Sequence, residues 1–204
     1  MLFVYYMLDA PDTAIRRTEL RPAHRQYLAA ENGRIFAAGP LWSDDRAAAE
    51  GSILILDWPD KTAAAAWLQD EPFTKNGVYG YVTIKAYDNK WPKNGRPPVR
   101  RSLFAHFCLN GEAAAGPRKQ YRPAHLDYLA ATSDRLFAAG PLFDDSVTAD
   151  LEDRVGSLYI VHVSDRSAAD AWLADEPFNK NGVYGDVWTQ AYENLWPQDA
   201  PADA

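Results

Sequence analysis

The 204-residue sequence is poor in cysteine and lacks any long apolar run. Its single cysteine, Cys108, excludes an internal disulfide framework and gives no zinc signature, since a second thiol is missing. No apolar stretch approaches the ~18 residues needed to span a bilayer. The apolar residues 1–8 lack a preceding basic region and reach Asp9 without a small-residue cleavage pattern. We therefore expect a strand there, a cytoplasmic location and no membrane partner.

Basic residues are also in the minority. The chain has 21 Lys and Arg against 28 Asp and Glu, a net charge of −7, which argues against a nucleic-acid partner because phosphate backbones require clustered cations. The exception is the Pro-containing segment 93–101, which we predict to be a basic, semi-extended linker. Walker, Rossmann and nucleophile-elbow motifs are missing, and so is a histidine pair at metal-binding spacing. We therefore predict no metal and no cofactor.

What the sequence does contain is a tandem repeat. Residues 21–41 are identical to residues 122–142 at fifteen of twenty-one positions, and residues 70–80 match residues 175–185 at ten of eleven. Two copies are too few for a solenoid, so each copy should be a domain that packs on the other. The predicted divisions are module 1 at 1–92, the linker at 93–101, module 2 at 102–197 and a C-terminal tail at 198–204.

Each module is predicted to follow the order β-α-β-β-α-β. In the first copy, Pro22 suits the first turn of the first helix, Gly33 ends that helix, and Gly39-Pro40 stops the second strand. This order is typical of an α+β, ferredoxin-like fold with both helices on one face of an antiparallel sheet. The other face needs cover, so we expect two such modules to pack as a pseudo-twofold dimeric α/β barrel within one chain, with further self-association left open. The predicted elements are strands at 2–7, 34–38, 51–58 and 79–87 and helices at 22–32 and 61–69.

His24 and His125 are the candidate bases. Each lies near the predicted start of its helix, where the helix dipole disfavours the charged imidazolium and favours a neutral ring that accepts a proton. Tyr27 and Tyr128 follow three residues later on the same helix face, within reach of the histidine. A histidine there could instead simply pack and bond a carbonyl, and both interpretations stay open.

Two acids end the second helix of each module, Asp70-Glu71 and Asp175-Glu176, and each pair precedes Pro-Phe. Proline disfavours helical geometry in the residue before it, so the acids lie where the helix gives way to a turn. They either cap that turn, or one of them faces the histidine, fixes its tautomer and raises its basicity. Sequence spacing does not choose between the two acids.

Further residues near these groups are candidates for binding a ligand. The phenylalanine and tyrosine after the acids would supply an apolar wall and a phenol, although both residue types are more often plain core. The repeated Gly-Pro is first a backbone demand, and it could also present N–H groups to a ligand. The candidate ligand contacts are Tyr27, Gly39, Pro40, Phe73, Tyr79, Tyr128, Gly140, Pro141, Phe178 and Tyr184.

Several short motifs occur in the same order in both copies: Arg-Pro-Ala-His, Ala-Gly-Pro, Gly-Ser at a strand start, and an acid before Pro-Phe followed by Gly-Val-Tyr. This set resembles the YCII-related (YciI-like) family over residues 1–92 and 102–197. The resemblance implies ferredoxin-like modules that assemble as dimeric α/β barrels, in agreement with the order of elements predicted above.

For function, the resemblance implies cofactor-free proton transfer on a small aromatic or lactone-like compound, with the histidine as base and the glutamate as its acidic partner. One branch of the family is similar to enzymes that remove chloride from chlorinated hydroxyhydroquinones, and the wider superfamily includes muconolactone isomerases. Lyase, dehydrochlorinase or isomerase chemistry is therefore expected. The family usually has Asp directly before the Pro-aromatic pair, whereas this chain has Glu there and Asp one residue earlier. The candidate catalytic residues are His24, Asp70, Glu71, His125, Asp175 and Glu176.

Two other functions compete with catalysis. The chain could be a non-catalytic module that binds or senses a small molecule, in which the polar residues only orient the ligand. The duplication could also serve assembly alone. An enzyme needs the histidine and carboxylate close together beside a pocket, a binding module needs the pocket, and an assembly module needs neither.

Overall fold

The structure is a computed structural model that describes residues 1–91, 102–148, 150 and 153–197. The predicted basic linker, 93–101, and the predicted tail, 198–204, lie outside the described residues. No helix in the described ranges is long and apolar enough to cross a membrane.

Both modules have the predicted βαββαβ order, with one extra short helix before the last strand. The first module contains β1 (Leu2–Asp9), α1 (Ala14–Ala30), β2 (Ile35–Trp42), β3 (Ala49–Asp57), α2 (Lys61–Asp70), α3 (Pro72–Lys75) and β4 (Tyr79–Tyr87). The second contains β5 (Leu103–Asn110), α4 (Ala115–Ala131), β6 (Leu136–Phe143), β7 (Arg154–His162), α5 (Arg166–Asp175), α6 (Pro177–Lys180) and β8 (Tyr184–Tyr192). A 3₁₀ turn precedes β2 and β6, at η1 (Asn32–Arg34) and η2 (Ser133–Arg135).

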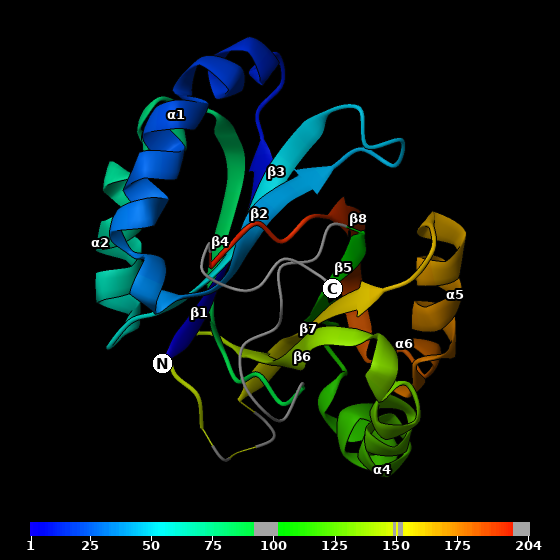
Figure 1. The fold of residues 1–204 in the computed structure, drawn as a ribbon. Coiled ribbons are helices and arrows are strands. Elements are labelled where there is room, and N and C mark those ends of the chain that lie inside the picture. The colour runs from blue at the N-terminus through cyan, green and yellow to red at the C-terminus, as the bar shows by residue number, and fades with distance from the viewer. Residues whose placement is uncertain (92–101, 149, 151–152, 198–204) are drawn as a thin grey trace.

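The strands of each module form an antiparallel sheet, in the order β4-β1-β3-β2 in the first module and β8-β5-β7-β6 in the second. The two sheets meet along two short seams, where β2 pairs with β8 and β4 pairs with β6. The strands thus close into a ring of eight. The chain is an α+β protein of the ferredoxin-like type, and Figure 1 shows α1 and α2 on one side of the strands and α4 and α5 on the other.

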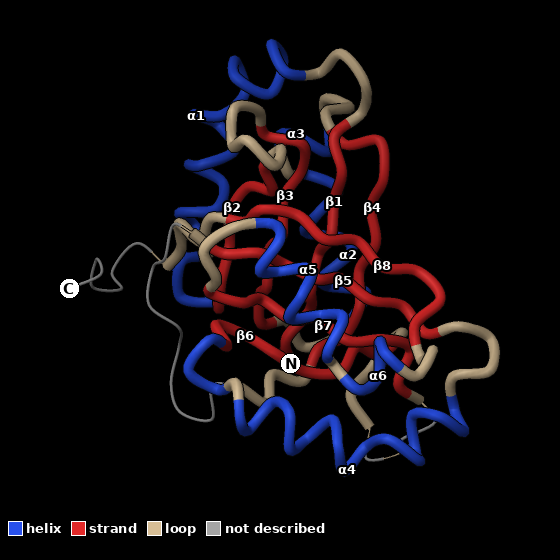
Figure 2. The backbone as a smooth tube through the Cα atoms, turned by 90° about the vertical axis from the view of Figure 1, so that its right-hand side faces the viewer, coloured by secondary structure: helices blue, strands red, loops and turns tan. Residues whose placement is uncertain are grey.

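Alternate residues of each strand face two different cores. On β1, Val4 and Tyr6 belong to a cluster inside the ring that both modules share, whereas Phe3 and Tyr5 belong to a cluster under the helices. Inside the ring, Tyr6 stacks on Phe107 of the other module, with ring centroids 4.5 Å apart. Figure 2 shows the strands at the centre of the molecule and helices outside them. The period-two pattern of a strand with both faces buried produces this division.

The first helix differs from the prediction. It begins at Ala14, so Pro22 lies inside it and His24 lies in its third turn. The dipole argument that placed His24 at a helix start is therefore wrong, because the effect of the dipole falls off within the first turn. Pro22 is tolerated on the exposed side of the helix, where water can bond the carbonyl that it leaves without a partner. Gly33 does not end the helix either; it lies in the 3₁₀ turn that follows.

The second strand also runs on through Gly39-Pro40, where the sequence predicted a stop. The glycine is needed because the chain that follows β8 crosses β2 there: a Cβ on Gly39 would lie 1.7 Å from the carbonyl oxygen of Glu193. The chain that follows β4 crosses β6 in the same way, with Asp88 over Gly140. Each module therefore extends an arm across the second strand of the other module.

Candidate functional site

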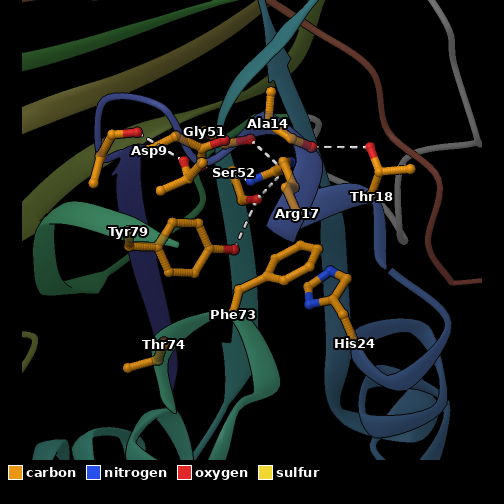
Figure 3. A network of polar contacts seen from close by, with 12 residues as sticks. Asp9, Ala14, Arg17, Thr18, His24, Gly51, Ser52, Phe73, Thr74 and Tyr79 are labelled. Atoms are coloured by element: carbon orange, nitrogen blue, oxygen red, sulfur yellow. Dashed lines mark hydrogen bonds and ion pairs between the residues drawn. The ribbon is translucent and has the colours of Figure 1, made fainter. Parts of the chain in front are cut away.

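Helix α1 carries Arg17 and His24 two turns apart, so both side chains point to the same side of the helix. Phe73, at the start of α3, lies between them. Its ring stacks on the His24 imidazole, with centroids 4.1 Å apart and planes 9° apart, and the guanidinium carbon of Arg17 lies 4.7 Å from the ring centre. Figure 3 shows the three side chains in this order. The phenylalanine therefore fixes the position of the imidazole from one face.

Glu71 holds the same imidazole from its edge. The Oε1 atom lies 2.7 Å from Nδ1 of His24, and the carboxylate also accepts hydrogen bonds from the backbone N–H groups of Phe73 and Thr74 as the N-cap of α3. Burial alone would raise the pKa of Glu71, but the bond and charge of His24, together with those backbone N–H groups, hold the pKa below its usual value. The carboxylate only accepts, so Nδ1 donates to it, and in the neutral form of the ring Nε2 is then the nitrogen that carries the lone pair.

Arg17 extends this arrangement into the sheet. Its guanidinium donates to Asp9 at 2.6 Å, to the carbonyl of Gly51 at 2.8 Å and to the hydroxyl of Ser52 at 2.9 Å. Ser52 in turn accepts a hydrogen bond from the hydroxyl of Tyr79 (Figure 3). Burial and the charge of Glu71 raise the pKa of Tyr79, so its phenol stays protonated and acts as a donor. Hydrogen bonds thus connect Arg17 of α1 with Asp9 of β1 and, through Ser52 of β3, with Tyr79 of β4.

The second module repeats this arrangement. Nδ1 of His125 lies 2.6 Å from Oε1 of Glu176, and the imidazole stacks on Phe178 with centroids 3.9 Å apart. The guanidinium carbon of Arg118 lies 4.8 Å from the centre of the Phe178 ring, and Arg118 donates to Ser157 at 3.0 Å. Tyr184 also donates to Ser157, and burial raises its pKa well above the usual value.

The structure chooses between the two candidate acids in each module. Glu71 and Glu176 are fully buried against the histidines. Asp70 is exposed and pairs with Lys75 at 3.4 Å, and Asp175 is exposed as well. The same glutamate therefore caps α3 and faces the imidazole, the two placements that the sequence had left as alternatives.

The remaining candidates divide into two groups. The first group lies beside the histidine of its own module, as described above, and consists of Phe73, Tyr79, Phe178 and Tyr184. The hydroxyls of Tyr27 and Tyr128 donate to the carbonyls of Trp67 and Trp172, so these side chains brace the second helix of each module and are engaged away from the histidines. The residues Gly39, Pro40, Gly140 and Pro141 mark the crossing points of the arms, and the last two also line a cavity.

Sequence reasoning missed the arginines and serines of the network. Arg17 and Arg118 occupy equivalent positions, 101 residues apart, and so did carry a signal in the repeat. They were missed because residues 14–21 were not expected to be helical. Ser52 and Ser157 belong to the repeated Gly-Ser motif, whose polar member is buried beneath the arginine.

A cavity of about 370 Å³ opens beside His125. Its apolar lining comes from both modules, since Trp91 lies on the arm of the first module and Leu126, Leu129 and Phe178 belong to the second. This volume falls within the range of small-molecule sites. In the described part of the chain, no three His, Cys, Asp or Glu side chains gather as metal ligands.

Comparison with known proteins places these features in a family. The sequence model of the YCII-related domain matches residues 1–88 and again residues 102–188. Protein YciI of Escherichia coli is 37% identical over 94 residues, which are 43% of this chain and 96% of that protein. A relative of that length corresponds to one module.

Two solved structures illustrate the range of similarity. The 5-chloro-2-hydroxyhydroquinone dehydrochlorinase of Burkholderia phenoliruptrix, in complex with 2,5-dihydroxybenzoquinone, is 27% identical, covers 43% of this chain and 94% of its own, and has a TM-score of 0.41. A chlorite dismutase from Candidatus Nitrospira defluvii covers 95% of this chain and 91% of its own, with a TM-score of 0.58 and 10% identity. The second comparison shows that the fold of the whole chain, with both modules, recurs in another protein.

Proposed function

The chain belongs to the YCII-related domain family, with one domain in each half, and from this premise we propose that it is a small-molecule enzyme that uses histidine as a general base without a cofactor. The observation that carries the proposal is the duplicated pair of histidine and buried glutamate, with separations of 2.7 and 2.6 Å. These distances lie in the range of a base and its orienting acid. Both copies of the pair are kept, which supports two working bases.

The proposed chemistry follows from the tautomer. Nε2 takes a proton from a carbon or hydroxyl of the substrate, and the buried glutamate stabilises the imidazolium that forms. In an elimination, the electron pair left behind expels a leaving group such as chloride from the neighbouring carbon, and the proton passes to solvent. In an isomerisation, the electron pair shifts a double bond, and the imidazolium returns its proton to another carbon.

The substrate proposed for this chemistry is a small aromatic or lactone-like compound. The cavity beside His125 supports this choice, because Trp91, Leu126 and Phe178 contribute apolar groups to the lining beside the base. Dehydrochlorinase, other lyase or isomerase activity all fit the same base.

We also propose that the two modules reproduce within one chain the paired barrel that single-module relatives would form as dimers. The matched seams between β2 and β8 and between β4 and β6, and the matched crossing arms, support this arrangement. The arm matters for function because it brings Trp91 of one module to the base of the other.

Activity assays on the whole chain test the enzyme proposal. We expect the purified protein to release chloride from a chlorinated hydroxyhydroquinone, or to change the absorbance of a muconolactone, and a His24→Ala/His125→Ala double variant to lose about 10²–10⁴-fold in rate. The two single variants would report how the rate divides between the sites. Equal rates in the parent and the double variant would reject the role of the base.

A second candidate function is binding or sensing without turnover. The cavity favours it, because a ligand can be held there whether or not a proton moves. Titration of the whole chain with 2,5-dihydroxybenzoquinone separates the two functions: saturable binding together with inert substrates would identify a binding module.

A further inference from the structure

The cavity beside His125 is rich in positive charge. Its lining includes Lys90 from the arm of the first module and Arg118, Arg122 and Arg154 from the second. The acids nearby are few and already engaged, since Glu176 bonds His125 and Asp88 pairs with Lys90. Within the described ranges, Asp88 also acts on Arg154, where its charge opposes the lowering of the pKa, but it is shared with Lys90.

Much of this charge is specific to the second module. Arg154, at the start of β7, takes the place that Ala49 has in β3, and Lys90 takes the place of Leu195 on the other arm. At Leu126 the difference is the opposite, because the first module has the charged residue at the equivalent position, the exposed Arg25. Repeat copies that share their base and acid thus differ at the cations around them.

The two buried arginines also differ in their partners. Arg17 forms an ion pair with Asp9 at 2.6 Å, whereas Arg118 bonds the neutral side-chain oxygen of Asn110 at 2.7 Å. The charge of Arg17 is therefore balanced within the first module. Arg118 is 5% exposed, and its hydrogen-bond acceptors in the described ranges, on Asn110, Gly156 and Ser157, are all neutral.

Two arginines that line the cavity each have a buried N–H donor without a partner in the described ranges. The Nε atoms of Arg118 and Arg154 are buried, and neither has a hydrogen-bond acceptor among the described residues. Buried N–H groups are rarely left without an acceptor, so each one calls for an explanation. Burial, followed by the charges of Arg118 and Arg122, also lowers the pKa of Arg154 from its usual value, as expected where cations are crowded together.

We propose that the cavity of the second module binds a small organic anion, a carboxylate or ionised phenol on an aromatic or alicyclic body, with Arg118 and Arg154 as its anion anchors. Trp91, Leu126 and Phe178 pack against the apolar body, and the guanidinium groups of Arg118 and Arg154 supply the positive charge that the anion faces. The equivalent place in the first module has no such preference, so the two sites differ in substrate. This inference rests on the proposed function insofar as the anion is the substrate of His125.

The experiment is calorimetric titration of the full chain with sodium benzoate and with benzamide, its neutral counterpart. We expect benzoate to bind at one site per chain. The variant Arg154→Ala introduces the residue type that the first module has at this position, and it should lower the affinity for benzoate at least about tenfold with little effect on the affinity for benzamide. Asn110→Asp should weaken benzoate as well, since it gives Arg118 the counter-charge that Arg17 has. Lys119→Ala removes a cation from the same helix outside the cavity and is the matched control.

Other outcomes separate the two proposals. Benzoate and benzamide binding equally, two equal benzoate sites per chain, or an Arg154→Ala variant of parental affinity and native circular dichroism would each overturn the anion site. Inorganic phosphate that binds as tightly as benzoate would overturn the role given to the apolar walls. Arg154-dependent benzoate binding in a chain whose turnover is unaffected by His24→Ala/His125→Ala would leave the anion site standing and remove the enzyme.

Discussion

The carbonyl oxygen of Asp88 occupies the space that a side chain on Gly140 would need, because an ideal Cβ there would lie 2.0 Å from that oxygen. The contact joins the two modules, since Asp88 begins the arm that leaves β4 and Gly140 lies within β6. The same arm carries Lys90 and Trp91 to the cavity. The close approach of two backbones therefore determines how the second site is completed.

Replacing this glycine should loosen the arm. We expect Gly140→Ala to lower the free energy of unfolding by about 2 kcal/mol or more, because the obstacle is backbone and must move as a whole. Urea denaturation followed by circular dichroism measures the change. Gly116→Ala is the control, since nothing lies within 4 Å of a Cβ there and alanine favours a helix. Similar losses in both variants would contradict the role of the crossing.

The two acids at the end of α2 should differ sharply when each is neutralised. Glu71→Gln removes the charge that bonds His24 and caps α3, so we expect a loss of about 1–3 kcal/mol in the free energy of unfolding. Asp70→Asn affects only an exposed pair with Lys75 and should change it by less than about 0.5 kcal/mol. Chemical denaturation at pH 7 compares the two variants, and equal effects would show that the buried pair contributes nothing special.

The fold and the site were predictable from the sequence only in part. The repeat and its turn residues predicted the order of elements, and the match between copies indicated His24 and an acid after the second helix. The choice of Glu71 depends on where α1 and α3 meet in space, which local spacing does not contain. Arg17 was missed because Pro22 suggested a helix start, whereas the helix begins at Ala14 and continues through this proline. The passage of β2 through Gly39-Pro40 depends on Glu193, which lies far along the chain.

Glu71 should also add to stability in a defined pH range. Its pKa in the folded protein is below the ordinary value of 4.5, so its contribution is present above that pH and is lost as the pH falls through the folded pKa. The difference in free energy of unfolding between the parent and Glu71→Gln should therefore shrink as the pH falls below about pH 5. Urea titrations at pH 3 to 7 would show this. A difference that stayed constant to pH 3 would contradict the lowered pKa.

Asp9 should show the opposite dependence. Its ion pair with Arg17 would lower the pKa, but burial outweighs that pair and, with the charge of Glu50, raises the pKa to about 6. A raised pKa means that folding favours the protonated acid, so the contribution of Asp9 to stability increases as the pH falls from above 6 towards 4. Asparagine is accepted at the equivalent place, since Asn110 bonds Arg118 there.

We therefore expect Asp9→Asn to fold normally and to remove this dependence. Relative to the variant, the parent should gain on the order of 1–3 kcal/mol in free energy of unfolding between pH 8 and pH 4. The measurement is a series of urea denaturations of both proteins across that range, with Asp12→Asn, at an exposed turn, as the matched control. Parallel curves for the parent and Asp9→Asn would mean that the ion pair, and not burial, governs this carboxyl group.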